Sequence, residues 1–256
     1  MFEAGQPAPA RAGILYLVPT LLGPAEVAAS LPATVARTVL GLDGFIAESA
    51  KSARQFLKAI EHPGPLSSVH IVELNEHTPD SALPGLLAPV RDGKRIGLLS
   101  EAGCPAVADP GAGLVALAHR DGLRVIPLVG PSSLLLALMA SGLNGQSFCF
   151  HGYLPTERTA RAGAIRRLEA DSLGSGACQL FIEVPYRNNN MLATLLDTCG
   201  PATRLCLATE LTLPGESIRT LRIDQWRRAV PDLDRRPTVF LLQAAAGAKK
   251  VGRAGG

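Results

Sequence analysis

Three carboxylates and one arginine of this sequence could take part in catalysis because of where they stand in the chain. Glu48 and Glu183 each end a short apolar run, and Glu101 closely follows a third such run. Burying a carboxylate in apolar surroundings costs free energy unless the carboxylate is paired. Glu48 and Glu183 therefore need a partner, which could be Lys51, Arg187, a main-chain amide or a ligand. A carboxylate can also take a proton from a hydroxyl group as a general base. We therefore predict Glu48, Glu101, Glu183 and Arg187 as candidate catalytic residues.

The stretch Arg95–Gly113 carries residues suited to contact a ligand through the main chain. Residues 96–99 form an apolar run that predicts a buried strand, and the glycines and prolines that follow prevent its regular continuation. Glycine lets the main chain approach a ligand closely, and proline holds a loop open at low entropic cost. Asp109 in this loop either stabilises the turn or contacts a ligand. Ser132–Ser133, farther along, is first a helix N-cap and second a ligand contact.

Several common kinds of site are not supported by the sequence patterns. The first apolar run is not followed by G-x-G-x-x-G, and neither a G-x-S-x-G elbow nor a Walker loop is present. A Rossmann dinucleotide site, a serine hydrolase and a P-loop nucleotidase are therefore excluded. The five cysteines include no C-x-x-C pair, and the histidines and carboxylates lack the spacing of metal ligands. We predict no metal site and expect most cysteines to be buried as small apolar residues.

The elements that would position these residues follow a strand–helix alternation in the first half of the chain. Five apolar runs alternate with helical segments and predict a five-stranded parallel sheet, whose strand ends share one edge; the runs are residues 13–18, 44–48, 69–74, 96–99 and 124–128. Beyond residue 147, some neighbouring strands lack a helix between them, which predicts a mixed sheet. The fold class is therefore α/β, with a parallel five-stranded domain followed by a smaller mixed-sheet α/β domain.

Composition and local pattern suggest how the 256 residues divide. We predict disordered tails at 1–12 and 246–256, an N-terminal α/β domain at 13–141, a linker at 142–146 and a C-terminal mixed α/β domain at 147–245. Apolar runs are too short for a membrane span, and no signal peptide is evident, so we expect a cytoplasmic protein. The net charge of +3 is mildly basic. A helix carrying Arg158, Arg161, Arg166 and Arg167 is either a nucleic-acid patch or a solvated face.

Six segments in a fixed order resemble the motifs of the tetrapyrrole methylase superfamily, and within it the ribosomal RNA small-subunit methyltransferase I family. That family carries a VPTPIGN-like start, an S-D-A-G-T-P-x-x-x-D-P-G loop, then V-P-G-P-S-A, F-x-G-F-L-P, Y-E-S-P-H-R and A-R-E-L-T-K. The corresponding segments here are VPTLLGP, SEAGCPAVADPG, LVGPSS, FHGYLP, IEVPYR and ATELTLPGE. The resemblance spans about residues 14 to 243.

The resemblance implies a two-domain S-adenosylmethionine-dependent methyltransferase that forms a homodimer and binds its cofactor in the interdomain cleft. Together with the polar strand ends, it gives these expected cofactor-binding residues: Pro19, Ser100, Glu101, Ala102, Gly103, Val107, Asp109, Ser132, Ser133, Ile182, Leu211 and Thr238. Methyl transfer needs the acceptor aligned with the methyl group and both desolvated, so it requires no metal. With a ribose hydroxyl of ribosomal RNA as acceptor, Lys51 or Arg187 could place a phosphate.

Three functions remain open at this point. The first is an RNA methyltransferase, with RNA or a ribosomal subunit as partner and strongly salt-dependent binding. The second is a methyltransferase of a tetrapyrrole or another metabolite, which predicts a closed, mostly apolar pocket. The third is a binding protein that retains the cofactor without catalysis. It is motivated by the segment Ala47–Lys51, which lacks an Asp and an Arg of the family's A-E-D-T-R pattern.

Overall fold

The computed structural model describes residues 13–245, and its contacts divide the chain into two compact units, Met1–Ser132 and Ser133–Gly256. The predicted tails, 1–12 and 246–256, lie outside the described residues. The predicted linker, 142–146, follows the first helix of the second unit. The domain boundaries expected from the sequence stay a prediction.

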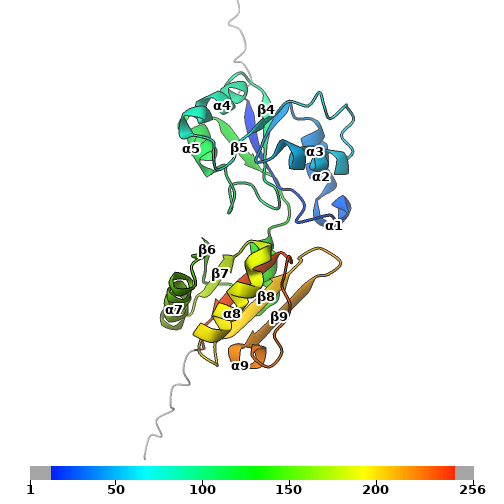
Figure 1. Cartoon of the computed structure of the whole chain (residues 1–256). Helices are drawn as coiled ribbons and strands as arrows, with labels where there is room; N and C mark the ends of the chain where they lie inside the picture. Colours follow the sequence, from blue (N-terminus) through cyan, green and yellow to red (C-terminus); the bar gives the residue numbers. More distant parts are fainter. Residues whose placement is uncertain (1–12, 246–256) are drawn as a thin grey trace, which may run out of the picture. The chain divides into compact units, whose positions relative to one another are not determined.

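The first unit is built on a parallel sheet of five strands (Figure 1). The strands are β1 (Ile14–Val18), β2 (Gly44–Ala47), β3 (Ile71–Glu73), β4 (Arg95–Leu99) and β5 (Arg124–Pro127). Their spatial order is β3-β2-β4-β1-β5, and every neighbouring pair is parallel. This confirms the predicted five-stranded parallel sheet. Leu99 pairs with both Val18 and Ala47, so the loops after β1, β2 and β4 begin at one level of one sheet edge.

Helices cover both faces of this sheet, which is why its central strands are apolar on both sides. The helices are α1 (Val27–Ser30), α2 (Ala33–Leu40), α3 (Ala50–Ala59), α4 (Leu83–Arg91), preceded by the 3₁₀ helix η1 (Asp80–Ala82), and α5 (Ala112–Arg120). Figure 1 shows α2 and α3 on one side and α4 and α5 on the other. Along β2, Phe45 and Ala47 belong to the core under α2 and α3, whereas Ile46 belongs to the core under α4 and α5.

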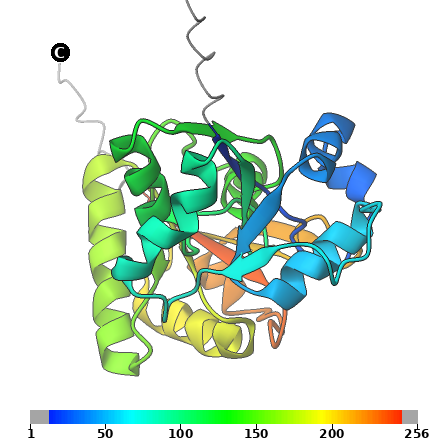
Figure 2. The same ribbon diagram turned by 90° about the horizontal axis from the view of Figure 1, so that it is seen from above.

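The second unit contains a mixed five-stranded sheet, as predicted. Its elements are α6 (Ser133–Ser141), β6 (Phe148–Tyr153), α7 (Arg158–Ser175), β7 (Cys178–Ile182), η2 (Pro185–Arg187), α8 (Asn188–Thr198), β8 (Arg204–Thr209), β9 (Ser217–Arg222), α9 (Ile223–Trp226) and β10 (Thr238–Gln243). The order is β6-β7-β10-β8-β9, with β6 and β7 parallel and the other pairs antiparallel. Figure 2 shows α7 as the long yellow-green helix.

Packing of the second unit corrects one expectation about the arginines of α7. Arg161 is buried and not part of a surface patch or solvated face. Its guanidinium donates to Thr194 Oγ1 on α8 from Nε at 3.0 Å and Nη2 at 2.9 Å, and to the carbonyl of Thr156 at 3.0 Å. The Thr194 hydroxyl and the Thr156 carbonyl therefore satisfy the buried charge, and α7 is held to α8. Arg158, Arg166 and Arg167 stay exposed.

Three of the five cysteines, Cys178, Cys199 and Cys206, are buried, which confirms their predicted role as small apolar residues. Burial raises the pKa of the Cys178 and Cys199 thiols to about 12. These thiols are therefore protonated and unreactive at neutral pH. Within residues 13–245, no helix combines the length and the apolar character that crossing a membrane requires.

Candidate functional site

Two loops at the carboxyl edge of the first sheet are joined by a main-chain hydrogen bond. The amide of Thr20, after β1, donates to the carbonyl of Gly103, after β4, at 2.9 Å. The Ser100 hydroxyl donates to the same carbonyl at 3.0 Å. Pro19, Thr20 and Ser100 are all buried. The structure thus brings together Pro19, Ser100 and Gly103, three of the residues predicted to contact the cofactor.

The loop after β4 is held in an unusual backbone conformation. Ala106 and Ala108 have φ values of 64° and 63°, and Gly103 and Gly111 have 81° and 132°. A left-handed conformation costs an alanine roughly 1–2 kcal/mol, so the surrounding contacts must hold the loop in place. Ala102 and Val107, both predicted cofactor contacts, are exposed on this loop. A rigid loop that presents main-chain groups can bind a ligand with little ordering entropy.

A third loop, after β5, packs directly on the other two. A Cβ placed on Gly130 would lie 2.2 Å from Cγ of Pro19, so only glycine allows this approach. The Cys104 thiol donates to the carbonyl of Pro131 at 3.4 Å. The predicted residues Ser132 and Ser133 follow directly, and Ser133 is the first residue of α6. We refer to the loops 19–25, 100–111 and 128–132 as the three-loop frame.

Carboxylates converge beside the three-loop frame. Burial, followed by the nearby charge of Glu101, raises the pKa of Asp109 to about 6, and a hydrogen bond with Ser100 opposes this rise. Burial, followed by the charges of Asp109, Glu101 and Glu76, raises the pKa of Glu48. We call these four residues the acidic cluster. The structure therefore brings together Glu48, Glu101 and Asp109, three predicted site residues, with Glu76 from the loop after β3. The negative charges of these carboxylates create a negative potential that favours a cationic ligand.

The raised pKa of Asp109 predicts a pH-dependent effect of the Asp109→Asn substitution. An aspartate in an unfolded chain titrates near ~3.9, so between about pH 4 and 6 the folded state binds more protons, and stability falls as pH rises. Asparagine removes this penalty. We expect Asp109→Asn to be more stable than the wild type above about pH 6, with the gain vanishing below about pH 4. Urea unfolding followed by circular dichroism at several pH values measures this difference.

The exposed Asp92→Asn substitution controls for the loss of one negative charge. A gain for Asp109→Asn that stays constant from pH 4 to pH 8 would contradict the raised pKa.

In the second unit, the other predicted cofactor residues lie at one edge of the sheet. Ile182 at the end of β7 pairs with Val239, and Thr238 at the start of β10 pairs with Thr209 at the end of β8. Leu211 follows β8 in a loop where Glu210 and Thr212 have φ values of 51° and 67°. Leu211 and Thr238 are buried, and the Thr238 hydroxyl donates to the Arg236 carbonyl at 2.9 Å. Ile182, Leu211 and Thr238 therefore share one edge of this sheet.

Glu183 and Arg187, both predicted from the sequence, form an ion pair at this edge. Arg187 Nη2 lies 3.0 Å from Glu183 Oε1, and the Val184 amide donates to the same oxygen at 2.8 Å. The Glu183 side chain is only 1% exposed. Glu183 thus has the partner that its sequence position required. Its role as a base stays a prediction.

Four buried polar atoms of the second unit have no hydrogen-bond partner among residues 13–245: Glu183 Oε2, Arg187 Nε, Asn188 Oδ1 and Thr212 Oγ1. Glu183, Arg187 and Asn188 lie close together in the sequence, and Thr212 belongs to the loop that carries Leu211. Sequence reasoning missed Asn188 of the second unit and Gly130 of the first unit. The segment LVGPSS could have marked Gly130 as a site residue. Its contact with Pro19 is visible only in the tertiary structure.

Comparison with known proteins places this arrangement among methyltransferases. The chain is 31% identical over 206 residues to "Ribosomal RNA small subunit methyltransferase I" of Escherichia coli O157:H7, covering 80% of this chain and 68% of that protein. It is 33% identical over 211 residues to the protein of the same name from Vibrio cholerae, covering 82% and 69%.

A solved structure, uroporphyrin III C-methyl transferase from Thermus thermophilus, superposes with a TM-score of 0.55 at 18% identity, covering 90% of this chain and 97% of that one. This likeness supports the predicted two-domain tetrapyrrole methylase-like fold. No protein-family model matches the chain.

Proposed function

Because the chain belongs to the ribosomal RNA small subunit methyltransferase I family and is an S-adenosylmethionine-dependent methyltransferase, we propose that it methylates a ribose 2′-hydroxyl of ribosomal RNA. Family membership confirms the methyltransferase expected from the sequence. The observation that carries the proposal is the three-loop frame: a glycine-dependent set of loops that exposes main-chain groups beside the acidic cluster. The RNA acceptor, the residue roles and the homodimer are parts of the proposal.

The three-loop frame fits the chemistry of S-adenosylmethionine, which supplies a methyl group on a positively charged sulfonium. The acidic cluster offers a negative potential for that charge and for the ammonium of the methionine moiety. In the proposal, the frame holds the donor through these residues: Pro19, Ser100, Glu101, Ala102, Gly103, Val107, Asp109 and Ser132. Ser133, the first residue of α6, is a further predicted contact. Ile182, Leu211 and Thr238 stay predicted contacts of the same donor from the second unit.

The acceptor hydroxyl must lose a proton as the new carbon–oxygen bond forms, and a carboxylate can receive it. Glu48 and Glu101 are the candidates in the acidic cluster, and the raised pKa of Glu48 makes it a stronger base than an ordinary glutamate. Glu183 is a weaker candidate because its side chain is 1% exposed and ion-paired with Arg187. The exposed Glu101 is free of such burial and receives a hydrogen bond from Ser52 Oγ at 3.2 Å.

We predict methyl incorporation into ribosomal RNA when the protein is incubated with labelled S-adenosylmethionine and small ribosomal subunits. Parallel reactions contain naked ribosomal RNA or a metabolite extract, and scintillation counting of each separated fraction gives the result. Incorporation should fall as salt is raised, since RNA binding releases counterions. Label found only in metabolites would favour a small-molecule methyltransferase. Cofactor binding by calorimetry without any methyl transfer would favour a non-catalytic binding protein.

Glutamine substitutions in the same assay test the two candidate bases. We expect Glu48→Gln or Glu101→Gln to lower turnover by about 10²–10⁴-fold for whichever residue is the general base. A variant that retains full turnover removes its residue from the candidate bases.

Light scattering of the purified chain separately tests the predicted homodimer.

A further inference from the structure

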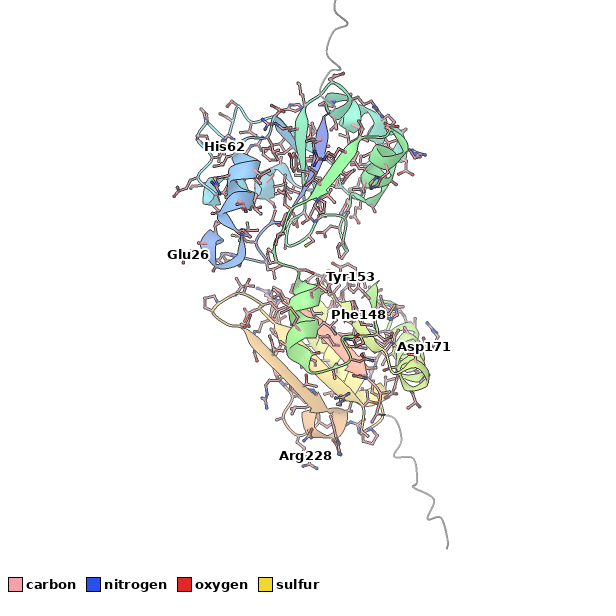
Figure 3. All side chains as sticks on the ribbon, turned by 180° about the vertical axis from the view of Figure 1, so that it is seen from behind. Glu26, His62, Phe148, Tyr153, Asp171 and Arg228 are labelled. Atoms are coloured by element: carbon pink, nitrogen blue, oxygen red, sulfur yellow. The ribbon has the colours of Figure 1, made fainter. Side chains whose placement is uncertain are left out.

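A cavity of about 460 Å³ in the first unit shares only Glu101 with the residues named as donor contacts. One wall is the loop after β1, residues 20–25, and the other is a face of α3 between Ser52 and Ala59. In Figure 3, the labelled residues Glu26 and His62 mark the chain just beyond these two walls. A volume of this size is typical of small-molecule sites in proteins, which range from about 300 to 1,000 Å³.

The lining of this cavity combines an apolar floor with a polar rim. Leu21, Pro24 and Phe56 contribute apolar surface, and Phe56 is 6% exposed and fixed in the core. Gln55 and Glu101 contribute polar groups. The Gln55 amide makes no side-chain hydrogen bond to any other described residue, so its donor and its acceptor are both available to a ligand. A flat, apolar ligand with a hydrogen-bonding edge fits this combination.

The cavity also adjoins the proposed site of methyl transfer. Glu101 lines the cavity and belongs to the acidic cluster, and Ser52 Oγ, also lining it, donates to Glu101 Oε1 at 3.2 Å. Thr20, on the opposite wall, is bonded through its amide to Gly103 of the three-loop frame. A ligand in the cavity would therefore contact the carboxylate proposed to act on the acceptor. This is the position expected for the part of the acceptor next to its reacting hydroxyl.

We propose that this cavity binds the base of the nucleotide whose ribose is methylated, a role that rests on the proposed function. Proteins that recognise single-stranded RNA take unstacked bases onto apolar or aromatic surface and read their edges by hydrogen bonds. A carboxylate oxygen accepts hydrogen bonds, so Glu101 suits an N–H donor on the base, and the Gln55 amide can donate to an adjacent ring acceptor. The base therefore presents a donor beside an acceptor on its Watson–Crick edge. Gln55 is then a specificity-determining residue, and the ligand is an extruded base of RNA.

Substitutions of Gln55 and Ala59 test this pocket without disturbing the core. Both residues are exposed, and Ala59 is the last residue of α3. Gln55→Ala removes the amide, and Ala59→Phe places a ring over the cavity. Gln146→Ala, an exposed glutamine of the second unit, is the matched control. The assay measures kcat and KM with small ribosomal subunits, together with the Kd for S-adenosylmethionine by calorimetry.

We expect Gln55→Ala to raise KM for the RNA roughly tenfold to a hundredfold, the effect of losing one hydrogen bond to a buried edge. Ala59→Phe should weaken RNA methylation at least as much, and both variants should bind S-adenosylmethionine with the wild-type Kd. Wild-type kinetics for both variants would overturn the pocket while leaving RNA methylation standing. Weaker binding of S-adenosylmethionine by either variant would show that the cavity belongs to the donor site, and would also overturn the proposed base pocket. An inactive wild type would overturn the proposed function and the pocket together.

Discussion

Replacing Gly130 with alanine is expected to weaken binding of S-adenosylmethionine severely while the chain still folds. The added Cβ would lie 2.2 Å from Cγ and 2.5 Å from Cβ of Pro19, far inside van der Waals contact. The ring of Pro19 is rigid and buried, so the loop after β1 must move away. Thr20 follows directly and carries the bond to Gly103, so this movement also disturbs the loop after β4. We expect an affinity loss of about a hundredfold or more, as misplaced binding groups commonly produce.

Isothermal calorimetry with S-adenosylmethionine measures this loss. Gly85→Ala is the matched control, because a Cβ at Gly85 meets no atom within 4 Å and the residue lies in helix α4. Circular dichroism of both variants should retain the wild-type spectrum. If Gly130→Ala bound the donor as tightly as Gly85→Ala, the three-loop frame could not be the donor site.

Removal of the Glu183 side chain is expected to destabilise the second unit strongly. Breaking a buried ion pair leaves an uncompensated charge and typically costs about 3–5 kcal/mol. The Glu183 side chain is 1% exposed, but that of Arg187 is 29% exposed, so water can partly solvate the arginine once its partner is removed. We therefore expect the loss of stability in Glu183→Ala to lie near the lower end of this range, at about 3 kcal/mol. The Val184 amide also loses its acceptor. Glu183→Gln keeps an oxygen for that amide and should cost less.

Denaturant unfolding followed by tryptophan fluorescence measures this cost directly. Trp226 is the single tryptophan and is buried in the second unit, so its emission reports on that unit. Asp234→Ala is the control, since the Asp234–Arg235 pair has a separation of 3.9 Å and side chains that are 55% and 86% exposed. Such a surface pair is worth at most about 1 kcal/mol. Equal costs for Glu183→Ala and Asp234→Ala would show that the Glu183–Arg187 pair contributes no special stability.

The Glu183→Gln variant also separates structure from catalysis. If Glu183 is a positioning residue, turnover of this variant should follow the loss of stability and recover under stabilising conditions. If Glu183 is the base, turnover should remain low even where the variant is fully folded. A pH–rate profile of the folded variant distinguishes the two cases.

Regular elements were predictable from the sequence because their signals are local. Periodicity and flanking turn residues mark residues 33–40 as a helix and residues 238–243 as a strand, and these ranges coincide with α2 and β10. A serine such as Ser49 is a favoured N-cap residue, and the Ser49 side chain accepts a hydrogen bond from the Ser52 amide at 3.3 Å. The four-residue helix α1 was not predicted, because one turn of helix carries too little periodic pattern.

The ends of helices are harder to predict from the sequence where a single residue sets the backbone conformation. Helix α7, which carries Arg158, Arg161, Arg166 and Arg167, runs to Ser175. Gly176 then adopts φ 73° and closes the helix. The helix ends there because glycine tolerates the left-handed conformation. In the sequence alone, one glycine is only a weak indication of a helix end. Arg161 is buried only because Thr194 of α8 lies opposite, so its burial depends on packing between two helices.

The sequence by itself determined the two kinds of sheet and the order of six motifs, which placed the chain in its family. The sequence also marked Glu48, Glu101 and Asp109 as polar groups at or after the ends of apolar strands. Such positions can be recognised because a strand and the turn after it are both encoded by residues that are neighbours in the chain. Only the tertiary structure decided that Thr20 bonds Gly103, that Gly130 packs on Pro19, and that a cavity opens beside Glu101. These contacts join residues distant in the chain, and their distances follow from how strands pair and helices pack, which no local pattern encodes.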